Sequence, residues 1–112
     1  MNQENIATQM RKGIVEFCFL YILSSGELYP SEIIMRLENA GLSLKEATAY
    51  TVLNRLKKDG KVTFRWCESP KGPPRKYFAL TERGRTALDL ARMEWNLIQS
   101  TILNLYKQNN QE

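Results

Sequence analysis

The feature that most restricts the fold is one pair of strand-like stretches, late in a chain whose other patterns are helical. In the first stretch, residues 61–67, the apolar Val62, Phe64 and Trp66 alternate with other residue types, as in a half-buried strand. The second stretch covers residues 75–80, and the turn-forming segment ESPKGPP joins the two into a predicted β-hairpin. Because an isolated hairpin is only marginally stable in water, we expect this one to lie against helices.

Three helices are predicted before the hairpin. The first covers residues 12–25 and is apolar on nearly all sides, so it needs cover from more than one side. The second begins with Pro30 at its first position and is closed by Gly41. The third begins with a predicted capping box of Ser43 and Glu46 and continues through ATAYTVLNRLKKD. The short connection between the last two gives them the spacing of a helix-turn-helix.

A fourth, longer helix is predicted for residues 81–107, with Thr81 as its N-cap. At 1.5 Å per residue it would be ~39 Å long, which exceeds the expected width of the preceding domain. It carries an apolar seam of heptad spacing, formed by Leu88, Ala91, Trp95, Ile98, Ile102 and Leu105. We expect a second copy of the chain to cover this seam in a two-fold homodimer. The alternative is a helix that folds back entirely on its own domain.

Together these patterns predict a mainly α fold with a small β-hairpin, namely a winged helix-turn-helix followed by a long C-terminal dimerisation helix. The 112 residues suffice for one compact unit. In this unit, residues 1–80 are expected to form the winged helix-turn-helix, and residues 81–112 the dimerisation helix with a short tail. The terminal KQNNQE is expected to fray.

Composition removes several function classes. The chain has no histidine and only two cysteines, Cys18 and Cys67, which lie far apart and are expected to be free thiols. A zinc site and a Ser-His or Cys-His nucleophile therefore lack their residues, and we expect no metal, no cofactor and no enzymatic activity. The segment RKGIVEFCFLYILSSG resembles a signal peptide, but Glu16 interrupts its apolar run, which is too short to span a membrane. We interpret it as a buried helix of a cytoplasmic protein.

Positive charge indicates a nucleic-acid partner, because residues 55–85 carry a net charge of +7 and the rest of the chain carries −3. The third helix has a predicted core face of Ala49, Val52, Leu53 and Leu56. Its opposite face is small, amide-bearing and cationic, which suits the major groove of DNA. Together with the hairpin cations, the predicted DNA contacts are Thr48, Tyr50, Thr51, Asn54, Lys58, Lys71, Arg75 and Lys76. The alternatives are an ordinary solvated face, or a winged-helix module that binds protein or RNA.

Four stretches carry a resemblance to a known family: LYPSEIIMRLE, LKEATAYTVLNRLKKDGKV, GPPRKYFALTERGR and the EW of Glu94 and Trp95. The chain resembles the bacterial PadR-like transcriptional regulators, in particular the short members with a single C-terminal helix. The resemblance implies a dimer that represses transcription at an inverted-repeat operator on double-stranded DNA and is released by a small molecule or a stress signal. The chain departs from the family pattern at Pro30 and Ser31, where relatives often have Gly-Tyr, and at Ala49, where leucine is usual.

The resemblance also implies a site for an effector. Some short members hold flat aromatic compounds at the dimer interface, stacked on a tryptophan of the last helix, and Trp95 occupies that position here. Trp95 and Gln99 are therefore the predicted contacts for an aromatic or phenolic ligand. The alternative is that Trp95 only packs in the interface.

Overall fold

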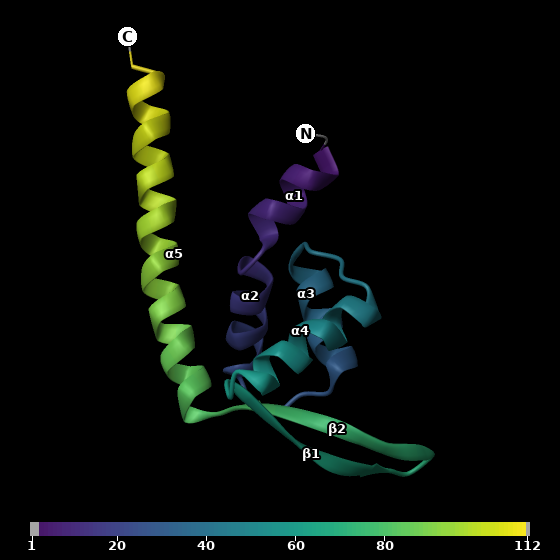
Figure 1. Ribbon diagram of the computed structural model, residues 1–112. Helices are drawn as coiled ribbons and strands as arrows, with labels where there is room; N and C mark the ends of the chain where they lie inside the picture. Colours follow the sequence, from purple (N-terminus) through teal and green to yellow (C-terminus); the bar gives the residue numbers. More distant parts are fainter. Residues whose placement is uncertain (1–2, 112) are drawn as a thin grey trace.

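The computed structural model describes residues 3–111, which form five helices and one two-stranded antiparallel sheet in a molecule of 64 × 32 × 23 Å. In chain order the elements are α1 (Gln3–Arg11), α2 (Ile14–Leu23), α3 (Pro30–Ala40), α4 (Glu46–Lys58), β1 (Val62–Ser69), β2 (Gly72–Leu80) and α5 (Glu82–Asn109). The helices α2, α3 and α4 form a body, the hairpin lies at its base, and α5 rises beside α2 (Figure 1). The predicted mainly α fold with a hairpin and a long last helix is confirmed.

The N-terminal region differs from the prediction of a single helix over residues 12–25. Gly13 has a φ of +85°, a backbone conformation that favours glycine, and it separates α1 from α2. The sequence does not predict α1, because its larger apolar side chains Ile6 and Met10 are exposed and mark no buried face. The prediction that the next helix is covered on more than one side is confirmed, since α2 packs against α3, α4, α5 and β2 and buries Phe19, Leu20 and Leu23.

The start and the end of α3 agree with the prediction. Pro30 is its first residue, and Gly41, with a φ of +124°, follows its last turn. The carboxylate of Glu32 accepts a hydrogen bond from the backbone N–H of Tyr29 at 2.8 Å, which satisfies a donor that the helix itself leaves free. The turn into α3 is therefore set by a proline and a glutamate close together in sequence.

The predicted capping box at the start of α4 is wrong. The helix begins at Glu46, and its N-cap residue Lys45 makes no side-chain capping bond. Ser43 lies two residues before the N-cap, in a connecting segment where Leu42 and Leu44 both pack against the core. Because two leucines at alternate positions face the same core, the segment stays extended and keeps the serine hydroxyl away from the first turn.

The core lies where α2, α3 and α4 meet the base of the hairpin and the first turns of α5. Its buried members are Phe19, Leu20, Leu23, Leu28, Ile33, Leu37, Ala49, Val52, Leu53, Leu56, Val62, Phe78, Leu80 and Leu88. The four residues predicted as the core face of α4 are all among them. The hairpin is fastened to this core by two backbone hydrogen bonds between Leu28 and Phe78, with N–O distances of 3.0 and 2.9 Å.

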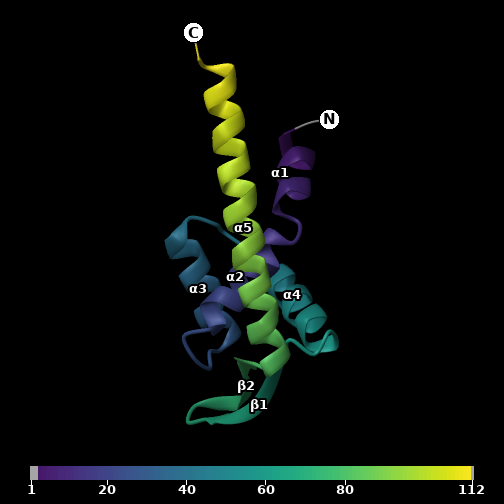
Figure 2. The ribbon, with the colours of Figure 1, turned by 90° about the vertical axis from the view of Figure 1, so that its left-hand side faces the viewer.

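The hairpin is longer than predicted. Its strands pair from Val62 opposite Leu80 to Ser69 opposite Gly72, so the turn itself holds only residues 70 and 71. The predicted alternation on β1 holds from Val62 to Arg65 and is wrong at Trp66, which is 62% exposed, whereas Val62 at the base is buried. The outer half of the hairpin projects beyond the helices in Figure 1, the whole hairpin lies below the body in Figure 2, and most of the Trp66 side chain is open to solvent.

The last helix begins as predicted and extends far beyond the core. The Thr81 hydroxyl accepts a hydrogen bond from the backbone N–H of Gly84 at 3.0 Å, which confirms Thr81 as the N-cap. At 28 residues, α5 is about 42 Å long. Leu88 lies in the core of its own chain at 5% exposure, whereas every residue from 92 to 109 is exposed. The exposed part of the predicted seam therefore begins near Ala91, which is half-buried.

Candidate nucleic-acid interface

The exposed face of α4 carries the side chains that the sequence assigns to DNA. Ala49, Val52, Leu53 and Leu56 anchor the helix in the core, so the residues between them point outward. Thr51 donates its hydroxyl to the carbonyl of Ala47 at 3.0 Å, which fixes the rotamer and leaves the hydroxyl oxygen able to accept. The structure places all five predicted α4 contacts at the surface: Thr48, Tyr50, Thr51, Asn54 and Lys58.

A groove of about 350 Å³ separates this face from the hairpin. Tyr50 of α4 lines one wall, and Arg75 and Lys76 of β2 line the other. The structure thus brings together predicted contacts from two elements that are well separated in sequence. The remaining lining residues are Pro30, Ser31, Ile34, Glu46, Trp66 and Pro74. Trp66, which was predicted on a half-buried face, is instead an exposed aromatic residue of this groove.

The three predicted cations of the hairpin do not lie together at its turn. Only Lys71 occupies the turn, while Arg75 and Lys76 lie within β2, opposite Cys67 and Trp66. The ammonium of Lys76 lies 4.5 Å from the centroid of the Phe64 ring and 5.6 Å from that of Trp66. The prolines 73 and 74 also belong to the strand, so they stiffen the hairpin edge rather than its turn.

Arg75 is held in place by its neighbours. Its guanidinium stacks on the ring of Tyr29 at 4.1 Å and donates a hydrogen bond to the hydroxyl of Ser31 at 2.9 Å. Ser31 is one of the departures from the family pattern, so in this chain the second position of α3 binds the hairpin directly. A guanidinium has five donors, and those not used by Ser31 remain available at the groove.

A second set of contacts joins the segment that precedes α3 to the hairpin. Arg65 donates to the carboxylate of Glu27 at 2.9 and 3.3 Å, and this bond raises the pKa of Arg65. The rings of Tyr29 and Tyr77 stack with centroids 4.6 Å apart. A hydrogen bond with the Cys67 side chain raises the pKa of Tyr29 above its ordinary value. These contacts fix the angle of the hairpin relative to α3 and α4.

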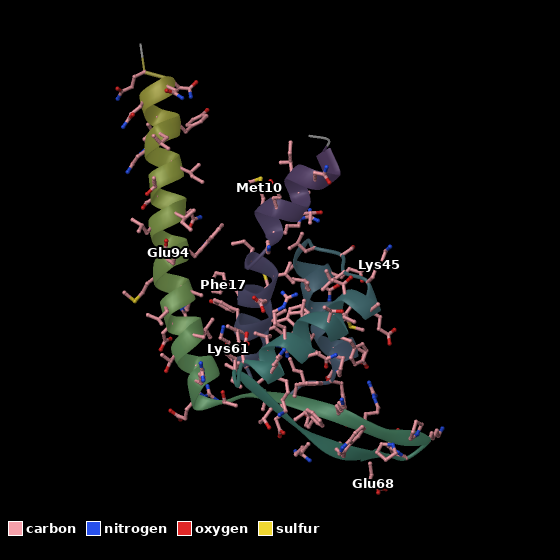
Figure 3. All side chains as sticks on the ribbon, viewed as in Figure 1. Met10, Phe17, Lys45, Lys61, Glu68 and Glu94 are labelled. Carbon is pink, nitrogen blue, oxygen red and sulfur yellow. The ribbon has the colours of Figure 1, made fainter. Side chains whose placement is uncertain are left out.

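The predicted effector residue Trp95 lies at a shallow pocket of about 330 Å³ between α2 and α5. Its ring centroid is 6.5 Å from that of Phe17, which lies on the side of α2 that faces α5 (Figure 3). The guanidinium of Arg92 covers the nearby ring of Tyr21 at 5.2 Å. Gln99, the second predicted contact, is exposed further along α5 and does not line this pocket.

Over residues 3–111, no three histidine, cysteine, aspartate or glutamate side chains gather as metal ligands would. In the same range, no helix is both long enough and apolar enough to cross a bilayer. Cys18 and Cys67 are free thiols, and burial raises the pKa of the Cys18 thiol, which disfavours its reactive thiolate form.

Comparison with known proteins gives consistent matches. The model of the transcriptional regulator PadR-like family matches residues 19–90. A PadR-like transcription factor from Bacteroides fragilis is 39% identical, with a TM-score of 0.79 over 90% of this chain and 98% of its own. A PadR-like regulator from Bacillus cereus is 32% identical, with a TM-score of 0.80 over 93% and 99%. Bacillus subtilis PadR, solved with operator DNA, is 25% identical, with a TM-score of 0.63 over 68% and 44%. No curated protein matches the chain.

Proposed function

Because this chain belongs to the PadR-like family of transcriptional regulators, we propose that it is a homodimeric repressor that reads an inverted-repeat operator in double-stranded DNA. In this proposal, residues 1–80 bind the DNA and residues 81–112 join the two copies. A small aromatic or phenolic ligand releases the dimer from its operator. The proposal agrees with the operator complex of the Bacillus subtilis relative.

The observation that carries the proposal is the outward face of α4. A helix of about 10 Å in diameter fits the major groove, and this one presents small and amide-bearing side chains there. The Asn54 amide can pair with adenine through two hydrogen bonds, and the methyl group of Thr51 can contact that of thymine. Tyr50, on one flank of this face, and Lys58, at the last residue of the helix, reach phosphates rather than bases.

The hairpin acts as a wing on the neighbouring backbone. Lys71 at the turn and Lys76 at the groove are exposed or half-exposed cations that bind phosphate through counterion release. Arg75 has a double role, because it contacts the backbone with its free donors while Tyr29 and Ser31 hold it. The contacts of Arg75 and Arg65 keep the wing in place before DNA binds, so little order is lost on binding.

Dimerisation positions two such faces for one operator. The seam beyond Ala91 leaves Trp95, Ile98, Ile102 and Leu105 between 38% and 60% exposed, and an apolar stripe of this length is typical of an interface. Two recognition helices related by a two-fold axis contact half-sites about one duplex turn apart, ~34–36 Å. The operator is therefore expected to be an inverted repeat.

The pocket between Phe17 and Trp95 is the proposed effector site. Its aromatic walls and the nearby Arg92 suit a flat ligand with an acidic or phenolic group. A ligand that spreads α2 from α5 would change the distance between the two recognition helices, and this is how binding would release DNA. The Trp95→Ala variant should lose ligand binding, as measured by calorimetry with a series of planar phenols at chain concentrations where the variant is still dimeric. Unchanged ligand affinity would remove the site.

Selection of duplexes from a random library tests the function itself. The wild-type chain should enrich an inverted repeat and prefer it to random competitor by ~10³-fold or more at physiological salt. A chain that binds protein or RNA instead would enrich no sequence. That outcome would leave the family assignment intact but remove operator reading from the account.

A further inference from the structure

A second groove runs along the flank of α4 that faces away from the wing. It has a volume of about 340 Å³, and its floor is apolar, formed by Val15, Leu44 and Val52. Its rim holds three cations, Arg11 and Lys12 from the junction of α1 and α2 and Arg55 from α4. The other lining residues are Thr8, Gly13, Glu16, Thr48 and Thr51.

The two grooves border the same helix face from opposite sides. Glu46 and Tyr50 line the groove next to the wing, whereas Thr48, Thr51 and Arg55 line the second groove. At 100° per residue, these two sets lie on either side of Asn54. Asn54, which is proposed to read a base, therefore lies between two grooves that both carry positive charge.

The backbone at the junction holds Arg11 and Lys12 at a fixed corner. The N–H of Lys12 bonds to the carbonyl of Thr8 at 3.2 Å, which completes the last turn of α1. The carbonyl of Gly13 then accepts from the N–H of Phe17 at 3.0 Å, which begins α2. The two cations thus belong to a sharp turn between helices, and both are exposed.

Arg55 is held over the groove by a partly buried carboxylate. Its guanidinium lies 3.9 Å from the Oε1 atom of Glu16, which is buried and has no hydrogen-bond partner among the residues that the structure describes. At this distance the pair attracts without a hydrogen bond, so the arginine donors stay free. The Arg55 side chain is 55% exposed and that of Glu16 is 24% exposed. The cation therefore faces outward and the carboxylate inward.

We propose that this second rim, Arg11, Lys12 and Arg55, binds the sugar-phosphate backbone of the DNA strand that borders the major groove opposite the wing. The inference rests on the proposed function. The major groove is about 12 Å wide and is bordered by one backbone on each side, so a helix that fills it meets both. The apolar floor accepts the deoxyribose, and the rim cations bind phosphate. Because the Glu16 carboxylate faces inward next to Arg55, phosphate is bound at the outer rim.

The salt dependence of DNA binding tests the second rim. Each phosphate contact contributes about 0.9 to the slope of log K against log salt. On a random-sequence duplex, the Arg11→Gln/Lys12→Gln variant should therefore lower the magnitude of the slope by about 1.8. The matched control Lys107→Gln, in the last turn of α5, should leave the slope unchanged. An unchanged slope in the double variant, or an equal change per charge in the control, would overturn the inference.

A second measurement locates the contact on one strand. Phosphate-ethylation interference on the selected operator should give two patches in each half-site. The Arg11→Gln/Lys12→Gln variant should lose one patch, and Lys71→Gln should lose the patch on the other strand. Loss of the same patch in both variants would overturn the inference. If the wild-type chain selects no operator, the proposed function itself fails. If the wild-type chain selects an operator but shows no second patch, only the inference about the second rim is refuted.

Discussion

The seam on α5 gives the most quantitative prediction, for the Ile102→Ala variant. Ile102 is 60% exposed in the single chain, and its neighbours within one turn are exposed as well. Complete burial of an isoleucine side chain contributes about 1.5–3 kcal/mol, so roughly 1–2 kcal/mol remains to be gained when a partner covers it. Because a two-fold dimer buries two copies, the variant should weaken dimerisation by about 2–4 kcal/mol, which raises the dimer Kd roughly 30- to 700-fold.

Leu97→Ala is the matched control for this prediction. Leu97 is 58% exposed on the same helix, but it lies about 130° around the helix axis from the centre of the seam. Sedimentation equilibrium over a range of chain concentrations gives the Kd of each variant, and circular dichroism confirms that the helix content is unchanged. The reasoning is refuted if the wild-type chain is monomeric throughout, or if Leu97→Ala weakens the dimer as much as Ile102→Ala.

Three further variants test the DNA face and the start of α5. Asn54→Ala should cost about 1–3 kcal/mol on the selected operator and much less on random DNA; an equal loss on both duplexes, measured by fluorescence anisotropy, would contradict base reading. Arg75→Gln should lower the salt slope by about 0.9, and an unchanged slope would mean that its role is only to hold the wing. Gly84→Ala should lower the free energy of unfolding by about 1–3 kcal/mol in urea denaturation, because the added Cβ would lie 2.0 Å from the carbonyl oxygen of Lys61. Replacing a glycine within a helix by alanine usually stabilises a protein. If Gly84→Ala did so, the close approach of α5 to the Lys61 carbonyl would be able to relax.

The architecture could be predicted because its main signals are local. The alternating stretches, the Pro30 start, the Thr81 cap and the apolar face of α4 each depend on residues close in sequence, and the structure confirms them. The predicted Ser43 cap does not form, because Leu42 and Leu44 pack against the core. This tertiary effect overrides the local motif.

Parts of the candidate site could not be predicted for a related reason. Whether Trp66 is buried depends on how far along the hairpin the helices cover it. The alternation of residue types in the strand does not contain that information. The stacking of Arg75 on Tyr29 joins residues that are remote in sequence. The second rim also depends on the helix break at Gly13, because a continuous helix through this position would not form the corner that carries Arg11 and Lys12. Gly13 itself is the sequence signal that could have identified this break, because glycine readily adopts the positive φ found there.

The spacing of the operator half-sites tests the central claim most directly, because it requires both the dimer and the two recognition helices. The measurement compares the affinity of the wild-type chain for its selected inverted repeat with its affinity for the same duplex carrying five additional central base pairs. These base pairs rotate one half-site by about half a turn. The account predicts a loss of about 10²-fold or more, since the second helix can no longer bind at the same time. Equal affinity for the two duplexes would contradict it.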